Sequence, residues 1–315
     1  MITVVGEALV DVVTTPDGEQ RSHPGGSPAN VALTLARLQT PVTLLTDVGR
    51  DEPGAQVLRH LTGNGVQVDE TAVGDGPTSV AEARLDAEGI ATYEFRLRWQ
   101  LDSHAAVPAD SVCLHTGSLG AVLLPGADTV RALADAARAH ATISYDPNCR
   151  PAIQTDVEQA RRDVEDWVGR SDLVKVSDED LAWLYPGADP PEVAQRWLDR
   201  GPALVVVTQG GDGVHAATAA GTVDVAAVPV QVVDTVGAGD SYTGALLDGL
   251  SRNDLLGAQR RTALQRVDAA LLRRLLEDAA LVAAITCSRA GANPPTRAEL
   301  HAARQNGAVD SPTPG

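Results

Sequence analysis

The chain has 315 residues, of which 43% are hydrophobic, and a formal net charge of −17. This length and composition fit one large α/β domain, or two smaller ones, with a buried core. The acidic balance argues against nucleic acid and anionic membranes as partners, because both bind through basic patches. An anionic substrate therefore has to be bound by local arginines or by backbone amides.

The N-terminal segment and the cysteines favour a cytoplasmic location. Residues 1–13 are apolar but are interrupted by Glu7 and Asp11, which favours a buried strand over a signal peptide. No apolar run approaches the length that spans a bilayer. The three cysteines, Cys113, Cys149 and Cys287, are widely spaced and form no Cys-x-x-Cys pair, which is typical of reduced thiols in a cytosolic protein.

Strands and helices are predicted to alternate along most of the chain. A strand at residues 2–6 is followed by a helix at 27–38, a strand at 42–48 and a helix at 53–61. After residue 110 the pattern predicts strands at 111–115, 142–145, 173–176 and 204–208, a β excursion to 230, and helices at 127–140, 157–168, 269–287 and 296–304, with two short helices after 176. Such repeated units predict a doubly wound, mostly parallel sheet.

One segment departs from this rhythm. Residues 78–85 and 91–97 alternate between polar and apolar side chains on either side of a turn at 86–89. This pattern predicts a β-hairpin with one polar face, which does not belong in a sheet covered on both sides. On the second strand, alternation places Tyr93, Phe95, Leu97 and Trp99 on one face, and Glu94, Arg96 and Arg98 on the other.

The most informative stretch is Asp234-Thr235-Val236-Gly237-Ala238-Gly239-Asp240, between an apolar extended run at 228–233 and a helix expected at 241–250. Small residues at such a junction let several backbone N–H groups point at one spot, where the helix terminus adds positive charge. The carboxylate of Asp240 lies beside this anion site. It can take a proton from a hydroxyl while the amides hold the phosphoryl group that the hydroxyl attacks. The alternative is an ordinary helix cap.

A second glycine-rich stretch, Gly25-Gly26-Ser27-Pro28-Ala29-Asn30, precedes the first predicted helix. Two glycines allow close backbone approach, and the Asn30 amide can both donate and accept hydrogen bonds. Asp11, near the end of the N-terminal strand, is either an acceptor for a hydroxyl or an exposed charge. These properties suit the binding of sugar hydroxyls, and the alternative is a plain turn with a helix start.

The sequence argues against three other classes of nucleotide-binding protein. Lys175 is the only lysine, and it belongs neither to a Gly-Lys-Ser/Thr phosphate loop nor to a strand behind a protein-kinase glycine loop. A dinucleotide oxidoreductase is disfavoured because Gly6-Glu7-Ala8 follows the first strand, where Gly-x-Gly-x-x-Gly is required.

Together, Gly25-Gly26-x-x-x-Asn30 and Asp234-Thr235-x-Gly237-Ala238-Gly239-Asp240 resemble the two signatures of the ribokinase/PfkB family of carbohydrate kinases, and the resemblance extends from about residue 2 to residue 300. It implies a ribokinase-like, three-layer α/β/α domain over residues 1–304. A small β lid from about 12–23 and 76–100, and a flexible tail at 305–315, complete this expectation.

The resemblance also implies roles for individual residues. Asp240 is expected to be the catalytic base, with the amides of Gly237, Ala238 and Gly239 as the anion hole. The sugar is expected to contact Asp11, Gly26 and Asn30, with Gly25 beside them. Apart from the resemblance, we expect the apolar face of the lid, with Tyr93 and Phe95, to cover a neutral ketohexose, because apolar residues more often face inward. The alternative is that the arginine face covers the sugar, which would favour an acid sugar or a sugar phosphate. Asp146-Pro147-Asn148-x-Arg150 is similar to the fructokinase-like and ketodeoxygluconate-kinase-like branches, where Arg150 is expected to reach a phosphate. Without the family, this stretch reads as an ordinary turn.

Nucleotide and metal residues follow from the same resemblance. The nucleotide-binding turn corresponds to Thr208, Gly210, Gly211 and Gly213, and the segment beside the adenine to Cys287, Gly291 and Ala292. Ser177 and Asp180 stand where the family has Asn-x-x-Glu, which orders Mg²⁺ and its waters. The Asp180 carboxylate can still bind the ion through water, and a solvated helix cap is the alternative. Asp234 and Ser288 are candidate neighbours of K⁺.

We therefore predict a cytoplasmic, ATP- and Mg²⁺-dependent kinase that phosphorylates a primary hydroxyl of a sugar. Fructose is the first choice, 2-keto-3-deoxygluconate the second, and ribose or a nucleoside the third. A sugar-binding regulator that has lost catalysis is the non-enzymatic alternative, and the intact Asp240 counts against it. A homodimer formed through the lid is a further hypothesis.

Overall fold

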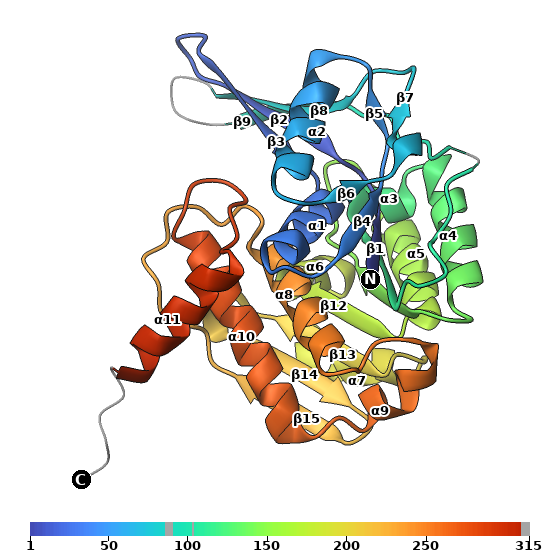
Figure 1. Cartoon of the computed structure of the whole chain (residues 1–315), viewed down its shortest axis with the longest axis vertical. Coiled ribbons are helices and arrows are strands. Elements are labelled where there is room, and N and C mark those ends of the chain that lie inside the picture. Colours follow the sequence, from blue (N-terminus) through green and yellow to red (C-terminus); the bar gives the residue numbers. More distant parts are fainter. Residues whose placement is uncertain (86–90, 103, 310–315) are drawn as a thin grey trace.

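The computed structural model of the chain describes residues 1–85, 91–102 and 104–309. The predicted turn at 86–89 and the last residues of the predicted tail lie outside this description. A nine-stranded sheet runs through the centre in the order β15-β14-β13-β12-β11-β10-β1-β4-β6 (Figure 1). Its strands are β1 (Ile2–Val5), β4 (Val42–Leu45), β6 (Gln67–Val68), β10 (Cys113–Gly117), β11 (Thr142–Asp146), β12 (Leu173–Ser177), β13 (Leu204–Thr208), β14 (Val214–Thr218) and β15 (Gly221–Val225).

All neighbouring strands of this sheet are parallel, except that β14 is antiparallel to both β13 and β15. Strands β4 and β10, which follow β1 in the chain, lie on opposite sides of it. Such a switch point in a parallel sheet opens a crevice at the carboxyl ends of the strands. The predicted doubly wound sheet is therefore confirmed.

Helices cover both faces of the sheet. Along β13, Leu204 and Val206 pack into one hydrophobic cluster, and Val205 and Val207 into the other, because successive side chains of a strand point to opposite faces. The first cluster includes α1 (Ser27–Arg37), α2 (Glu52–Gly63), α8 (Ala238–Arg252) and α10 (Ala269–Cys287). The second includes α3 (Ser118–Val122), α4 (Gly126–Ala137), α5 (Val157–Arg170), α6 (Asp178–Leu184) and α7 (Pro190–Leu198). This is the expected three-layer α/β/α arrangement.

A separate four-stranded sheet forms the predicted lid (Figure 1). Its order is β3-β2-β8-β9, with β2 (Leu9–Thr14), β3 (Gln20–Gly25), β8 (Ser79–Leu85) and β9 (Ala91–Arg96). The strand β2 follows directly from the carboxyl end of β1, so the lid emerges from the same edge of the main sheet as the crevice. A short pair, β5 (Val48–Gly49) and β7 (Val73–Gly74), completes the described strands.

The structure corrects the N-terminal prediction. The apolar run at 1–13 forms two strands of different sheets, β1 and β2, rather than one. The break occurs at Gly6, which has a φ of 159°, and a Cβ there would lie 2.2 Å from the Cγ of Pro28. Glycine at this position therefore lets the chain pass close to the start of α1.

The structure also corrects the prediction before the second glycine-rich motif. Residues 228–233 form no strand, and Val232 and Val233 are 59% and 62% exposed. The β excursion ends at Val225 and α8 begins at Ala238, so a long irregular segment leads to the helix. The apolar composition of residues 228–233 therefore does not reflect burial.

The C-terminal third is otherwise close to expectation. Helix α10 spans the predicted 269–287, and α11 (Arg297–Val309) continues past the end predicted for the last helix at 304. The connection at 251–267 contains the end of α8, a 3₁₀ turn, η3 (Ala258–Arg260), and α9 (Arg261–Gln265). Its Arg261 forms an ion pair of 2.6 Å with the buried Asp172, which ties this connection to the start of β12.

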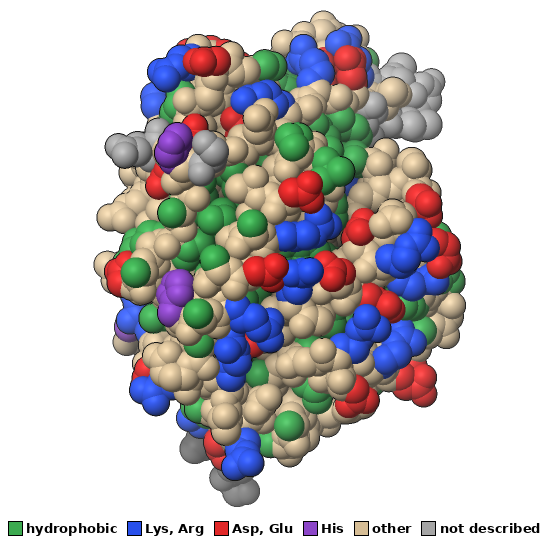
Figure 2. Space-filling view, turned by 90° about the vertical axis from the view of Figure 1, so that its right-hand side faces the viewer, with side chains coloured by type: hydrophobic (Ala, Val, Ile, Leu, Met, Phe, Trp, Pro, Cys, Tyr) green, Lys and Arg blue, Asp and Glu red, His purple; other side chains and the backbone are tan. Residues whose placement is uncertain are grey.

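The surface is mixed in charge. Figure 2 shows acidic and basic side chains interspersed over the face that lies on the right in Figure 1. Within the part of the chain that the structure describes, no helix is both long and apolar enough to cross a membrane.

Candidate active site

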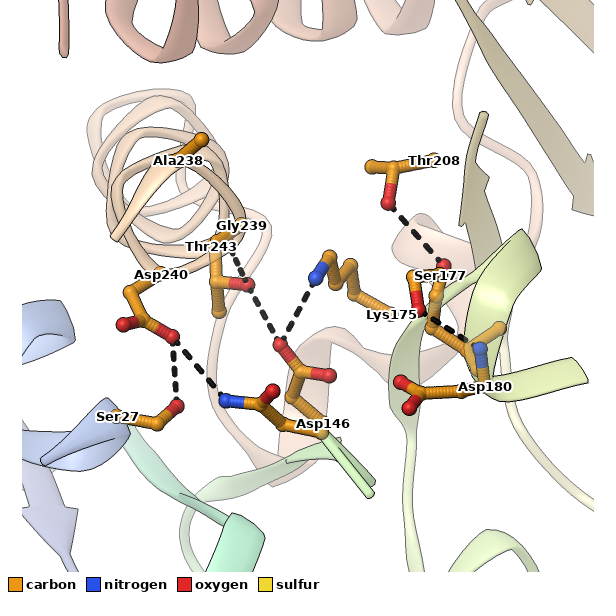
Figure 3. A network of polar contacts seen from close by, with 12 residues as sticks. Ser27, Asp146, Lys175, Ser177, Asp180, Thr208, Ala238, Gly239, Asp240 and Thr243 are labelled. Carbon is orange, nitrogen blue, oxygen red and sulfur yellow. Dashed lines mark hydrogen bonds and ion pairs between the residues drawn. The ribbon is translucent and has the colours of Figure 1, made fainter. Parts of the chain in front are cut away.

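The two glycine-rich motifs meet at Asp240. Ser27 donates a hydrogen bond of 2.6 Å to one carboxylate oxygen of Asp240 (Figure 3). Asn30 donates a hydrogen bond of 2.8 Å to the other oxygen. These contacts exist because α1 packs closely on α8, where a Cβ on Gly244 would lie 2.7 Å from the Cβ of Thr34. Asp240 is only 7% exposed. The structure therefore brings the predicted base and the predicted sugar-binding amide together.

The start of α8 offers unpaired amides. Gly237 caps the helix in the left-handed region, with a φ of 73°, a conformation that glycine adopts at little cost. The amide of Ala238 donates to the Thr235 carbonyl at 3.2 Å. The amides of Gly239 and Asp240 make no hydrogen bond within the described residues. The helix terminus thus presents free donors and partial positive charge beside the Asp240 carboxylate.

The environment of Asp240 tunes its basicity. Burial raises the pKa of its carboxyl group, while the hydrogen bonds from Ser27 and Asn30 lower it in part. The negative charge of Asp146 raises this pKa further, and Lys175 lowers it. A carboxylate whose pKa is raised toward the working pH is a better general base than an exposed one.

Asp146 and Lys175 form a buried ion pair beside the anion site. The Lys175 Nζ lies 3.1 Å from the Oδ2 of Asp146, and Thr243 of α8 donates a bond of 3.3 Å to the same oxygen (Figure 3). Asp146 is the last residue of β11, and Lys175 lies at the centre of the adjacent parallel strand β12, from which its long side chain reaches the Asp146 carboxylate.

Asp180 lies on the other side of this pair. Ser177 caps α6 by accepting a bond of 3.0 Å from the Asp180 amide, and the Asp180 Oδ1 accepts one of 2.9 Å from the Cys149 amide. Burial, followed by the charge of Asp146, raises the pKa of Asp180. The Asp180 side chain is therefore buried and directed toward the site. The helix cap that was the alternative is formed by Ser177, not by Asp180.

The donors fit a hard cation such as Mg²⁺. The Oδ1 atom of Asp146 is buried and has no hydrogen-bond partner among the described residues, so an acceptor is available. Three carboxylates, those of Asp146, Asp180 and Asp240, are buried near the ammonium group of Lys175. The described residues include no group of three or more His, Cys, Asp or Glu side chains that could hold a metal ion.

The sugar-side residues gather around Asp11. A Cβ on Gly25 would lie 2.1 Å from the Oδ2 of Asp11, and a Cβ on Gly26 would lie 2.5 Å from the carbonyl oxygen of Glu7. Both glycines therefore permit a close approach that no other residue allows. Burial raises the pKa of Asp11, while the charge of Arg150 lowers it and that of Asp240 raises it. Asp11 is thus within electrostatic reach of the predicted base.

The pairing of the lid strands shows which lid side chains lie on the same face of the sheet as Asp11. Asp11 pairs with His23 of β3 and with Ala81 of β8, and Ala81 pairs with Phe95 of β9. Residues paired across a sheet point to the same face, so Phe95 lies on the face of Asp11. Tyr93 is at a matching register position, but its side chain lies outside the described part of the structure.

The predicted apolar face of the second lid strand does not extend to Trp99. Strand β9 ends at Arg96, and Trp99 is buried in the body, where its Nε1 donates to the Gly120 carbonyl at 2.9 Å. Arg98 pairs with Asp47 at 2.6 Å. The alternation therefore describes the lid only up to the end of β9.

Arg150 acts on the turn that precedes it. Its guanidinium donates to the side-chain oxygen of Asn148 at 2.6 Å and to the backbone oxygens of Asn148 and Cys149 at 3.0 Å. Asn148, which has a φ of 38°, in turn donates a bond of 3.4 Å to Asp240. Arg150 thus holds the Asp146-Pro147-Asn148 turn against the base and lies within electrostatic reach of Asp11.

The predicted nucleotide residues line the same edge. Thr208 ends β13, and its hydroxyl donates to the Val176 carbonyl at 3.4 Å. Gly210 and Gly213 both have positive φ, and the positions of Gly210, Gly211 and Gly291 are open to added atoms. A Cβ on Gly237 would lie 2.6 Å from the Cβ of Ala292, so the segment after α10 borders the anion site.

Asp234 ties this segment together. Its carboxylate accepts bonds from the amides of Val236 at 3.0 Å and Gly291 at 2.8 Å, and the first of these is the largest cause that keeps its pKa low. Its own amide donates to the Cys287 carbonyl at 3.1 Å. Ser288 caps α10 and directs its hydroxyl to the Ile285 carbonyl at 2.7 Å.

Sequence reasoning missed several residues of this site. Ser27 contacts Asp240, and Thr243 and Lys175 contact Asp146. The sequence motifs assigned no role in the site to any of the three. One signal was available, since a lone lysine in the apolar strand 173–176 needs a buried partner.

The comparisons with known proteins agree with this geometry. Residues 1–299 match the model of the pfkB family carbohydrate kinases. A fructokinase of Rhizobium leguminosarum bv. trifolii is 34% identical over 274 residues, which cover 84% of each chain. The structure of a fructokinase with bound ATP from Xylella fastidiosa is 25% identical, with a TM-score of 0.84 over 98% of both chains.

A double-mutant fructokinase of Vibrio cholerae O395, solved with fructose, ADP and potassium ion, is also similar. It is 25% identical, with a TM-score of 0.77 over 96% of this chain and 98% of that one. These likenesses span nearly the whole chain, and the family match includes both glycine-rich motifs. The chain therefore belongs to the pfkB family of carbohydrate kinases, phosphotransferases that act on a sugar hydroxyl.

Proposed function

We propose that this protein is an ATP-dependent fructokinase in which Asp240 is the general base. The observation that carries this proposal is the position of Asp240. Its carboxylate lies between the sugar-side groups Ser27 and Asn30 and the unpaired amides of α8. The fructokinase relatives, one of them solved with fructose and ADP, supply the choice of sugar.

In the proposed reaction, Asp240 removes the proton from a primary hydroxyl of the sugar. The hydroxyl oxygen then forms a bond to the γ-phosphorus of ATP as the bond from that phosphorus to the β-phosphate oxygen breaks, and ADP leaves. The amides of Gly239 and Asp240, with that of Gly237, hold the oxygens of the transferred group. Preorganised donors of this kind stabilise charge that develops in the transition state.

The lid supports a neutral ketohexose as the sugar. The face shared by Asp11 and Phe95 offers a hydroxyl acceptor beside an apolar ring, and such a combination suits an uncharged sugar. One observation favours the second candidate, 2-keto-3-deoxygluconate. Arg150 lies within electrostatic reach of Asp11 and provides a positive charge for a sugar carboxylate.

Mg²⁺ and K⁺ are the proposed ions. Asp146 and Asp180 would hold Mg²⁺, largely through water, and the ion would neutralise charge on the phosphate oxygens during transfer. Asp234, whose carboxylate stays ionised, and Ser288 are the proposed neighbours of K⁺. A potassium ion is present in the Vibrio cholerae relative. Thr208, Gly210, Gly211 and Gly213 are proposed to contact ATP, with Cys287, Gly291 and Ala292 beside the adenine.

We propose one functional domain over residues 1–304 and a homodimer formed through the lid. Strands β3 and β9 are the outer strands of the lid sheet, and such edges are templates for pairing with a second copy. Sedimentation of the intact chain tests the dimer, and deletion of β3 should abolish it. A cytoplasmic location is proposed as well, and the three free cysteines support it.

A panel of sugars with ATP, read by coupled release of ADP, tests the function. Fructose should be turned over with the highest kcat/KM, ahead of 2-keto-3-deoxygluconate, ribose and a nucleoside. A preference for 2-keto-3-deoxygluconate would move the proposal to the acid-sugar branch. No stimulation of ADP release by any sugar would favour the regulator that binds sugar without catalysis.

A further inference from the structure

Lys175 occupies an unusual place for its residue type. It is the only lysine of the chain, and it lies in β12 among aliphatic side chains that fill the core. The residue is only 5% exposed, and no arginine is as buried among the residues that the structure describes. A buried cation is costly unless it is paired, so its presence calls for a specific partner.

The partner within the protein is Asp146, but the ammonium also faces the anion site. The Nζ atom is 3.1 Å from Asp146, and a Cβ on Gly239 would lie 2.9 Å from the same Nζ. The amide of Gly239 is one of the unpaired donors of α8. Figure 3 shows the lysine side chain directed from β12 toward Asp146 and the start of α8.

The carboxylates of Asp146, Asp180 and Asp240 are all buried at this edge of the sheet, and the ammonium of Lys175 pairs with the first of them. The nearby His115 does not add a second positive charge, because burial lowers its pKa to about 4. Lys175 is therefore the one fixed positive charge within a group of three buried carboxylates.

We propose that Lys175 is a catalytic residue of this kinase, whose ammonium binds an oxygen of the transferred phosphoryl group beside the amides of α8. This inference rests on the proposed kinase function. Asp146 is the positioning residue that holds the ammonium in place. No bond to Lys175 forms or breaks, since it donates hydrogen bonds to the phosphoryl oxygens while the sugar oxygen replaces the ADP oxygen at phosphorus.

The rival explanation is that Lys175 only neutralises Asp146 so that the fold tolerates a buried carboxylate. The two explanations differ in what they predict for ligands. A lysine that contacts the phosphoryl group affects the transition state, whereas a neutralising lysine affects stability. The complex of ADP, aluminium fluoride and fructose mimics the transition state and serves as the probe.

The test compares the wild-type protein with Lys175→Met, which keeps the length of the side chain without its charge. We expect kcat to fall about 10²–10³-fold, the range seen when one donor to a developing oxyanion is removed. Affinity for ADP with aluminium fluoride and fructose should fall by a similar factor, with much less change in affinity for ADP alone. A variant within a few-fold of wild type in kcat, or one that loses no more affinity for the mimic than for ADP, overturns the inference.

A second comparison does not depend on the stability of the single variant. Asp146→Asn removes the carboxylate that pairs with Lys175, and the double variant Asp146→Asn/Lys175→Met removes the ammonium as well. The proposal predicts that the double variant binds the transition-state mimic at least about tenfold more weakly than Asp146→Asn, since the couplings of contacting residues are read from such cycles. Equal binding by the two variants overturns it.

Failure of the kinase function gives a different result. A wild-type protein that phosphorylates no sugar contradicts the proposed function and this inference together. An active wild type with an equally active Lys175→Met contradicts only the role of the lysine.

Discussion

Asn30 of α1 donates a hydrogen bond of 2.8 Å to Asp240 of α8, across 210 residues of sequence. The contact joins the two glycine-rich motifs at a single carboxylate. One oxygen of Asp240 is held by Asn30 and the other by Ser27, so the carboxylate is fixed in orientation relative to both the sugar side and the anion site. Substitutions at Asp240 and at Asn30 should therefore affect turnover, stability and pH dependence differently.

The variant Asp240→Asn keeps the size of the side chain but cannot accept the substrate proton. We expect turnover to fall by about 10²–10⁴, the usual contribution of a general base, while ATP binding is retained. Steady-state kinetics and a nucleotide titration measure the two effects. Asp254→Asn, at an exposed acid beyond α8, is the matched control and should behave like wild type. Turnover by Asp240→Asn within a few-fold of wild type would rule out the role of base.

The same variant should not destabilise the protein at neutral pH. Burial raises the pKa of Asp240 above its ordinary value of 3.8, so between these two pKa values the folded chain holds a proton that the unfolded chain has lost. Stability therefore decreases as the pH rises through this window. An amide has no charge to desolvate, so we expect the Tm of Asp240→Asn at pH 7.5 to equal or exceed that of wild type. A marked drop in Tm would show that the hydrogen bonds outweigh burial.

The pH dependence of turnover gives a further prediction. The hydrogen bond from Asn30 lowers the pKa of Asp240, so its removal in Asn30→Ala should raise that pKa further. At saturating sugar, the acid limb of the kcat profile should therefore move to higher pH, because the base must be deprotonated to act. An acid limb that stays in place in Asn30→Ala would assign it to another group.

Glycine at 239 should be essential for the anion site. In Gly239→Val the added Cβ alone would lie 2.9 Å from the Lys175 Nζ. The rest of the branched side chain would crowd the phosphoryl group. We expect a large loss of kcat with ATP affinity retained through the adenine side. Gly169→Val, in α5, is the matched control, because nothing lies within 4 Å of an added Cβ there. Unchanged kinetics for Gly239→Val would make this junction structural only.

The metal prediction separates Asp180 from Glu179, its neighbour in α6. Asp180→Asn keeps an acceptor for the Cys149 amide but loses the charge, so the Mg²⁺ concentration for half-maximal rate should rise by about 10–100-fold, the usual effect of losing an outer-shell ligand. Asp180→Glu should be tolerated. Glu179→Ala removes the neighbouring exposed acid and should leave the titration unchanged. A normal Mg²⁺ titration for Asp180→Asn would assign Asp180 to the fold.

Much of the fold was predictable because burial leaves a periodic trace in the sequence. Helix α10 and the strand β11 were located nearly residue by residue, since an apolar stripe or run there coincides with burial. The same reasoning failed at 228–233, where Val230, Val232 and Val233 are exposed. Composition reports what a segment could bury, whereas the packing around a site decides what it does bury.

The site was predictable where local chemistry carries it and not where packing does. The small residues at 237–239 announce a helix terminus that binds an anion, because their backbone alone determines that property. The contacts of Ser27 and Thr243 depend on how α1 and β11 pack against α8, which no local pattern encodes. Lys175 was judged only against known phosphate-loop motifs, so its position beside Gly239 was not expected.

Phosphorus NMR of the products from ATP and fructose tests the central claim most directly. With the wild-type protein we predict ADP and, in equal amount, a phosphate monoester whose phosphorus is coupled to the two protons of a sugar CH₂ group. With Asp240→Asn this signal should appear at least about 100-fold more slowly. Release of inorganic phosphate without a sugar phosphate, or equal rates for the two proteins, would contradict an Asp240-dependent transfer to a primary hydroxyl of fructose.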